Sequence, residues 1–291
     1  MTSAGHWLAG ARPKTLGASV SPVLVGTAVA SRYGDVIWWR AGAALAVAVA
    51  LQVGVNYAND YSDGVRGVDT AARKGPVRLT ASGLAAPAAV KRAATLSLAV
   101  AALIGIVLAV AVAWWLILVG AACVLAAALY SGGPKPYASA GLGEVMVLVF
   151  FGLVATCGSV FVHVERLPWL AVASAVPMGL AACAILLANN LRDVTTDAAA
   201  GKRTLAVRIG APAARRLYTA CVVVAGLMPA VLATEAPAAA LGLLALPAAV
   251  APLRTVRNPE ATPPQLVGAL IGTARFQLLL AVLLALGLWD W

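Results

Sequence analysis

Charged residues are scarce in this chain. Only 11% of its 291 residues are Asp, Glu, Lys or Arg, while 62% are hydrophobic. An ordinary soluble domain has about 25% charged residues. The composition therefore excludes a soluble globular protein and indicates a chain whose solvent is the lipid bilayer.

Histidine and cysteine are also few. The two histidines, His6 and His163, are expected at opposite faces of the membrane, which excludes a histidine pair. The four cysteines all lie inside apolar runs: Cys123, Cys157, Cys183 and Cys221. Their spacing is not that of metal ligands, so we expect them to pack between helices. The amino-terminal segment is not typical of a cleaved signal peptide and is expected to be part of the fold.

Long apolar runs make up most of the sequence. A helix that crosses a bilayer needs about 20 mainly apolar residues. Nine runs bounded by charged residues, proline or glycine cover residues 15–31, 38–60, 92–112, 113–130, 141–163, 168–190, 213–233, 236–253 and 265–288. We therefore expect an all-α polytopic membrane protein with nine transmembrane helices around a central cavity.

The basic residues are distributed unevenly between the two sets of loops. With the amino terminus inside the cell, 17 of the 21 basic residues fall on the cytoplasmic side, and the other four are Arg32, Arg40, Arg166 and Arg275. Basic residues in short loops are retained in the cytoplasm, so we expect a cytoplasmic amino terminus. This bias, together with an anionic substrate, accounts for the net charge of +10 without nucleic acid.

Acidic residues gather in two segments, of which the first is NYANDYSDGVRGVD at residues 56–69. Gln52, just before this segment, and three polar residues within it follow one another at helical spacing: Gln52, Asn56, Asp60 and Asp63. Spacings of three and four residues place these side chains on one stripe of a helix. Gly64 and Gly67 are expected to end the helix, so that Asp69 can fold back toward the same stripe.

The second segment, NNLRDVTTDAAAGKRTLAVRIG, occupies residues 189–210. Asn189, Asp193 and Asp197 again recur every four residues, and Gly201 is expected to end their helix. Both rows lie at the cytoplasmic ends of helices that are four elements apart. We therefore expect one domain over residues 1–291, built from two related four-helix units plus one helix, in which the two rows face each other across the cavity.

Helix capping and solvated loop charges are the ordinary explanation for a lone acidic residue beside a membrane. Carboxylates inside an apolar helix are costly, however, and they usually mark function. Clustered carboxylates repel one another unless cations bridge them. Mg²⁺ prefers oxygen ligands and is commonly held by one or two carboxylates together with substrate phosphates. The two rows therefore predict a magnesium and diphosphate site.

Basic residues beside these rows can neutralise a diphosphate. Lys135, Arg192 and Lys202 are favoured for this role because they adjoin glycine or the aspartate rows, and Arg78 comes from the first cytoplasmic loop. A diphosphate bound by an enzyme made of apolar helices implies a lipid tail. Allylic diphosphates ionise to carbocations when a metal neutralises the leaving group, and an electron-rich aromatic ring can capture such a cation.

These residues resemble the UbiA-type intramembrane prenyltransferase superfamily, whose members carry Asn-x-x-x-Asp-x-x-Asp and Asp-x-x-x-Asp motifs in a nine-helix bundle. Within it, several strings are most similar to the 1,4-dihydroxy-2-naphthoate polyprenyltransferases of menaquinone biosynthesis. The strings are ARPKTL at 11–16, NYANDYSDGVRGVDT at 56–70, GPVRLTASG at 75–83, YSGGPKPY at 130–137, GLGE at 141–144 and the whole second segment. The resemblance covers essentially the entire chain.

The resemblance implies that a polyprenyl group is transferred from polyprenyl diphosphate to 1,4-dihydroxy-2-naphthoate, with loss of carbon dioxide, to give demethylmenaquinol. It implies a Mg²⁺ cofactor and a multi-pass protein of the cell membrane, in contact with membrane lipid, whose active site faces the cytoplasm. No nucleic acid and no required protein partner are expected.

The resemblance also assigns roles to individual residues. The implied metal-binding and catalytic residues are Asn56, Asp60, Asp63, Asp193 and Asp197. The implied diphosphate-binding residues are Asn56, Arg78, Lys135, Asn189, Arg192 and Lys202. Tyr130 is assigned to cation stabilisation, although an interfacial anchor explains it equally well. Arg12 is assigned to the acceptor carboxylate or to the charge bias, and Asp69 and Glu144 to the periphery of the site.

Two other functions remain open from the sequence. Another acceptor, such as 4-hydroxybenzoate or homogentisate, would use the same fold and metals. A cation-coupled secondary transporter would also show repeats and buried carboxylates. Transporter sites tend toward the bilayer midplane, whereas both rows here lie at one face beside basic loops.

Overall fold

The computed structural model describes residues 2–67 and 78–291, and all regular elements within these ranges are helical. The long helices are α2 (Gly17–Ser31), α3 (Trp38–Val65), α4 (Pro87–Val112), α5 (Leu116–Ser131), α7 (Ala155–Val164), α8 (Trp169–Arg192), α11 (Ala211–Leu232), α12 (Leu246–Arg257) and α13 (Pro263–Leu288). The short ones are α1 (Ala4–Ala11), η1 (Pro13–Thr15), η2 (Tyr137–Ala140), α6 (Gly143–Val147), η3 (Leu148–Val154), α9 (Val194–Ala199), α10 (Leu205–Ile209) and η4 (Pro237–Ala245). The predicted all-α class is confirmed for the described part of the chain.

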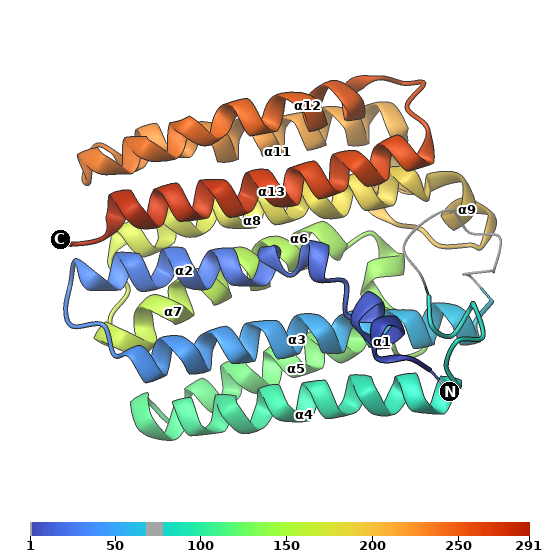
Figure 1. The fold of residues 1–291 in the computed structure, drawn as a ribbon, viewed down its shortest axis with the longest axis horizontal. Helices are drawn as coiled ribbons and strands as arrows, with labels where there is room; N and C mark the ends of the chain where they lie inside the picture. Colours follow the sequence, from blue (N-terminus) through green and yellow to red (C-terminus); the bar gives the residue numbers. More distant parts are fainter. Residues whose placement is uncertain (1, 68–77) are drawn as a thin grey trace.

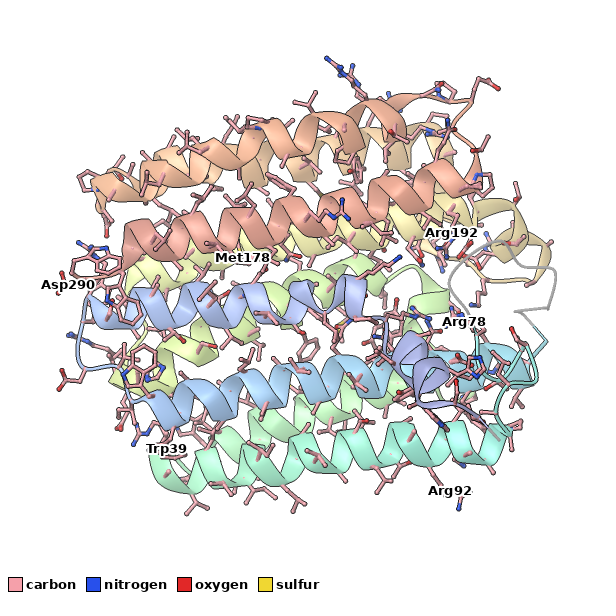
Figure 2. All side chains as sticks on the ribbon, in the orientation of Figure 1. Trp39, Arg78, Arg92, Met178, Arg192 and Asp290 are labelled. Carbon is pink, nitrogen blue, oxygen red and sulfur yellow. The ribbon has the colours of Figure 1, made fainter. Side chains whose placement is uncertain are left out.

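The long helices run side by side in one bundle, with the amino and carboxyl termini at opposite ends (Figure 1). Short helices α1 and α9 lie at the end that holds the amino terminus. Arg78 and Arg192 lie at this end, where both are buried, whereas Trp39 and Asp290 lie at the other (Figure 2). The polar residues of the two motifs therefore gather at one end of the bundle.

Seven helical stretches within the described ranges are long and apolar enough to cross a membrane. The other two predicted spans correspond to α2 and α5, which are apolar but only 15 and 16 residues long. Large side chains on the outer face of α4 are exposed, such as Leu103 and Val110. Because such a surface is unfavourable in water, it indicates contact with lipid, and the chain is a multi-pass membrane protein.

Two predicted spans are not single α-helices. The run at 141–163 is divided into α6, the π-helical segment η3 and α7. Gly152 of η3 meets Gly179 of α8 so closely that a Cβ on either residue would approach the other backbone to 3.0 Å or less. The run at 236–253 begins with the 3-10 helix η4 before α12. Hydrophobic length predicted both spans, but it carries no information about the hydrogen-bond pattern inside them.

Helix α8 lies at the centre of the main core. It packs against α2, α11, α13 and η3, and its side chains Met178 and Leu187 are fully buried. A second, smaller core of Tyr57, Leu79 and Val90 joins α1 and α3 to the start of α4. Because Leu79 is fully buried there, it fixes the backbone of its neighbours Arg78 and Thr80 beside α3.

Candidate active site

The polar residues of α3 divide between two directions. Each residue turns an α-helix by about 100°, so Asn59 and Asp63 lie within about 20° of Gln52, while Asp60 lies about 80° away. Gln52, Asn56 and Asn59 accordingly line a large cavity. From the sequence, Asp60 was expected on the same stripe as Asp63. In the structure Asn59, rather than Asp60, shares the direction of Asp63.

Asp60 points toward the chain segment that precedes α4. Its Oδ2 accepts a hydrogen bond of 2.7 Å from the backbone N–H of Leu79, and its Oδ1 accepts one of 2.9 Å from Thr80. The carboxylate is 2% exposed. Asp60 therefore holds the segment that carries Arg78, and its role as a metal ligand stays a prediction.

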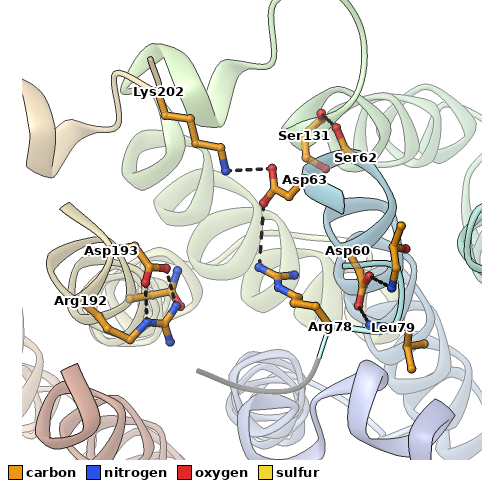
Figure 3. A network of polar contacts seen from close by, with 11 residues as sticks. Asp60, Ser62, Asp63, Arg78, Leu79, Ser131, Arg192, Asp193 and Lys202 are labelled. Carbon is orange, nitrogen blue, oxygen red and sulfur yellow. Dashed lines mark hydrogen bonds and ion pairs between the residues drawn. The ribbon is translucent and has the colours of Figure 1, made fainter. Parts of the chain in front are cut away.

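Asp63 connects three parts of the chain (Figure 3). Its Oδ1 lies 2.8 Å from Nζ of Lys202, and its Oδ2 lies 3.9 Å from Nη2 of Arg78. Lys202 follows α9, and its backbone N–H donates to the carbonyl of Asp197. The ion pairs thus join the first motif to the loop after the second motif.

The second motif does not form one continuous helix. Helix α8 ends at Arg192, Asp193 is the junction residue, and α9 begins at Val194. The Arg192 guanidinium binds both oxygens of Asp193, with 2.7 Å from Nε to Oδ1, and its Nη2 also donates to Oδ1 of Asn189 at 2.9 Å. The predicted spacing nevertheless holds, because the N–H of Asp197 bonds the carbonyl of Asp193 as in a helix.

The side chains of both motifs converge on a small cavity of about 50 Å³, which we call the polar cavity. Its polar lining consists of Asn59, Asp63, Arg78, Tyr130, Ser139, Asn189, Asn190, Asp193, Asp197, Lys202 and Thr204. Opposite charges are paired on its wall, where Asp63 meets Lys202, and Asp193 pairs with Arg192, which lines the larger cavity beside it. The expectation that the two rows face each other across a cavity agrees with this arrangement.

A much larger cavity of about 1370 Å³ adjoins the polar cavity, and we call it the apolar cavity. The two share Asn59, Tyr130, Leu186 and Asn189 as lining residues. The remaining walls are mainly aliphatic and aromatic side chains of α3, α4, α5, η3 and α7. Its volume exceeds the range of about 300 to 1000 Å³ that is usual for small-molecule sites, so it can hold a long apolar ligand.

Tyr130 occupies the junction of the two cavities. Its ring meets the ring of Tyr137 edge to face, with centroids 5.5 Å apart. Burial raises the pKa of Tyr137 to about 12, so at neutral pH its phenol keeps the proton that it donates to the carbonyl of Ala126 at 2.8 Å. This bond fixes Tyr137 and, through it, the ring of Tyr130. Arg12, after α1, lines the apolar cavity near the same end.

Among the described residues, Lys135, Asp60 and Glu144 are predicted site residues that line neither cavity. Lys135 is exposed and lines neither of them, because the turn between α5 and η2 carries it outward. Asp69 lies outside the described residues. The other predicted residues line one or both cavities: Arg12, Asn56, Asp63, Arg78, Tyr130, Asn189, Arg192, Asp193, Asp197 and Lys202.

Asn59 and Asn190 were not predicted as site residues. Asn190 donates a 2.9 Å hydrogen bond from Nδ2 to Oε1 of Glu144, which is buried behind the polar cavity. This bond fixes the amide of Asn190 at the cavity wall. The angular position of Asn59, four residues before Asp63, was a signal available in the sequence, whereas the contact between Asn190 and Glu144 spans 46 residues and was not.

The donor set of the polar cavity fits a hard divalent cation. Within the described ranges, no group of three or more His, Cys, Asp or Glu side chains is placed to hold a metal ion. Three carboxylates and three amides nevertheless line the same cavity. Mg²⁺ usually takes one or two carboxylates plus substrate phosphates and does not require an all-protein cage, so these oxygen donors suit Mg²⁺ that arrives with a diphosphate.

The fold and the paired motifs define an intramembrane prenyltransferase, and the chain belongs to the UbiA prenyltransferase family, whose model matches residues 19–273. It is 50% identical to a 1,4-dihydroxy-2-naphthoate octaprenyltransferase of Mycobacterium tuberculosis, over 89% of this chain and 88% of that one. It is 37% identical to the protein of the same name from Escherichia coli, over 76% and 74% of the two chains. The resemblance seen in the sequence is thereby confirmed.

Solved structures have the same fold. A UbiA homolog from Archaeoglobus fulgidus, bound to GPP and Mg²⁺, aligns over 96% of this chain and 99% of its own, with a TM-score of 0.67 and 14% identity. An apo UbiA homolog from Aeropyrum pernix K1 aligns over 95% and 97%, with a TM-score of 0.61 and 18% identity. At these identities the similarity establishes the fold alone.

Proposed function

We propose that this chain transfers a polyprenyl group from polyprenyl diphosphate to 1,4-dihydroxy-2-naphthoate, with release of diphosphate and carbon dioxide, in menaquinone biosynthesis. The observation that carries the proposal is the junction of a charged polar cavity with an apolar cavity of about 1370 Å³. This geometry matches a substrate with an anionic head and a long apolar tail. The two relatives described above support the choice of acceptor.

The reaction starts when the allylic C–O bond breaks and its electron pair leaves with the diphosphate. The ring carbon that carries the carboxylate attacks the cation and forms the new C–C bond. The pair of the C–COO⁻ bond then returns to the ring as carbon dioxide leaves. Demethylmenaquinol, the product, has gained a prenyl group at the carbon that lost its carboxylate.

The basic residues in and beside the polar cavity stabilise the departing diphosphate. Arg78 and Lys202 approach from the side of Asp63, and Arg192 approaches from the second motif. Charge-assisted hydrogen bonds of this kind stabilise a leaving group most when they are already in position. Asn189, held by Arg192, and Asn56 complete the proposed contacts, and Lys135 would require movement of its turn.

Magnesium is the proposed cofactor, held by Asp63, Asp193 and Asp197 together with the diphosphate, with Asn56 and Asp60 as further predicted ligands. Bound Mg²⁺ acts as a Lewis acid that stabilises the charge on the leaving group. Asp193 and Asp197 are on the cavity wall, where a cation bound with the diphosphate would reach their carboxylates. Asp69 remains a predicted member of the site.

Tyr130 is the proposed residue that stabilises the allylic cation, and its lining of both cavities supports this role. The naphthoate carboxylate is assigned to Arg12, which lines the apolar cavity on the side of α1. The aromatic acceptor would then lie between Arg12 and Tyr130.

We further propose nine transmembrane helices in one domain of two four-helix units plus one helix, with α2 and α5 as its two short spans. The amino terminus and the active site face the cytoplasmic side of the cell (plasma or inner) membrane. The uneven distribution of basic residues supports a cytoplasmic amino terminus. The polar cavity lies at the end of the bundle that holds the amino terminus (Figures 1 and 2), so the active site would face the same side.

The experiment is turnover by the purified protein in detergent, with Mg²⁺, octaprenyl diphosphate and either 1,4-dihydroxy-2-naphthoate or 4-hydroxybenzoate. The expected result is a prenylated and decarboxylated product from the naphthoate only. A product from 4-hydroxybenzoate alone would contradict the proposed acceptor and keep the reaction class. Because detergent micelles hold no ion gradient, turnover there excludes a gradient-driven transporter.

A further inference from the structure

The apolar cavity extends far from the polar cavity. On α3 its lining residues run from Asn59 to Ala44, fifteen positions that span about 22 Å at 1.5 Å per residue. The hydrocarbon core of a bilayer is about 30 Å thick. The cavity therefore follows the bundle through most of the membrane and has a distal end remote from the charged residues.

Three glycines from three helices line this distal end: Gly105 of α4, Gly120 of α5 and Gly158 of α7. Each lies within about 6 to 11 Å, along its own helix, of the helix end that is remote from the polar cavity. Glycine is unfavourable in a helix interior by about 1 kcal/mol relative to alanine. Three of them at one depth of one cavity call for a physical reason.

Packing between helices is not the reason. A Cβ added at Gly105, Gly120 or Gly158 would meet no neighbouring atom within 4 Å. Gly152 and Gly179 are different, because their backbones touch and leave no room for a side chain. The open space beside the three distal glycines is the cavity itself, so their small size determines its width at that depth.

We propose that Gly105, Gly120 and Gly158 determine the length of the polyprenyl chain that the enzyme accepts, by keeping the distal end of the apolar cavity wide enough for the far isoprene units. The inference rests on the proposed function, in which the diphosphate is anchored at the polar cavity. With the head fixed there, only a long tail reaches the three glycines. A short tail ends before them.

A larger side chain at these positions therefore narrows the cavity for long substrates only. Added atoms in a filled apolar site are costly because the contents must shift. For a tail that reaches the glycines, we expect kcat/KM to fall by about tenfold or more. For a tail that stops short of them, the same substitution adds no contact.

The test measures kcat/KM of Gly105→Leu, Gly120→Leu and Gly158→Leu with geranyl diphosphate and with octaprenyl diphosphate, in Mg²⁺ and saturating naphthoate. The expected result is an unchanged value for geranyl diphosphate and a fall of about tenfold or more for octaprenyl diphosphate. A graded series of Ala, Val and Leu at Gly158 keeps the test decisive if a leucine variant fails to fold. The ratio of the two values should then fall with side-chain volume.

Gly42→Leu and Gly268→Leu are matched controls. A Cβ at either glycine would also meet nothing within 4 Å, but both residues are exposed and neither lines the cavity. These variants should retain the wild-type ratio of kcat/KM for octaprenyl diphosphate to kcat/KM for geranyl diphosphate. If the wild type is active and the distal variants lower kcat/KM equally for both diphosphates, or for neither, the inference is overturned. A wild type that is inactive with both diphosphates would contradict the proposed function as well.

Discussion

The ammonium of Lys202 lies 2.8 Å from the carboxylate of Asp63, so the loop after α9 is joined to α3 across the polar cavity. A diphosphate entering this cavity offers the lysine a second anionic partner. The ion pair thus holds the ammonium at the place where the leaving group would develop charge. Lys202 should contribute more to binding of the diphosphate than to the fold.

Lys202→Gln is expected to raise KM for the prenyl diphosphate by about 10- to 150-fold, because a hydrogen bond to a charged group contributes about 1.5 to 3 kcal/mol. Steady-state kinetics at fixed Mg²⁺ measures the change. Arg257→Gln is the control, since Arg257 is exposed at the carboxyl end of α12 and should give wild-type kinetics. An unaltered KM in Lys202→Gln would remove Lys202 from the diphosphate site.

Asp63→Asn and Asp193→Asn are expected to lower turnover by about 100-fold or more, because each replaces a carboxylate of the polar cavity with a neutral amide of the same shape. The assay is product formation at saturating substrates, with size-exclusion chromatography to confirm that the variants are folded. Asp35→Asn, an exposed acidic residue before α3, is the matched control. Full activity in either cavity variant would refute the assigned metal site.

Asp60→Asn is expected to destabilise the protein as well as to inactivate it. Both carboxylate oxygens accept backbone hydrogen bonds, from Leu79 and Thr80, and an amide leaves one of these N–H groups without an acceptor. Such a loss costs about 1 to 3 kcal/mol, so thermal unfolding should begin at a lower temperature than in the wild type. Equal thermal stability of Asp60→Asn and wild type would show that the hydrogen bonds from Leu79 and Thr80 to Asp60 do not stabilise the fold.

Removal of divalent cations is expected to abolish turnover. EDTA should silence the wild-type enzyme, and added Mg²⁺ should restore it, because the polar cavity offers oxygen donors but no complete metal cage of its own. Restoration by Ca²⁺ at the same concentration should be weaker, since Ca²⁺ prefers more ligands at longer distances. Full activity in EDTA would contradict the cofactor assignment.

Hydrophobic length predicted the positions of the helices. The nine apolar runs correspond to the seven long candidate spans and the two shorter apolar helices α2 and α5. Helix boundaries and internal breaks were less predictable. The π-helical segment η3 coincides with the contact between Gly152 and Gly179, and a contact between distant residues leaves no trace in local hydropathy.

The convergence of the two motifs was predictable from their spacing, whereas the directions of single residues were not. Spacing brought Asp63 and Asp193 to one cavity, but it could not show that Asp60 turns toward Leu79, because that segment has no helical periodicity to place it. Lys135 was assigned from its neighbouring residues, and the exposed turn that holds it was not predictable from them. The position of Asn190 in the cavity wall could not be predicted, because it depends on a hydrogen bond to the distant residue Glu144.

The central claim is the decarboxylating prenyl transfer, and the most direct test is turnover of 1,4-dihydroxy-2-naphthoate labelled with ¹³C in its carboxyl group. Purified enzyme, Mg²⁺ and octaprenyl diphosphate should release labelled carbon dioxide and diphosphate in equal amounts, together with an unlabelled prenylated quinol. A prenylated product that retains the label, or release of diphosphate without labelled carbon dioxide, would contradict the account.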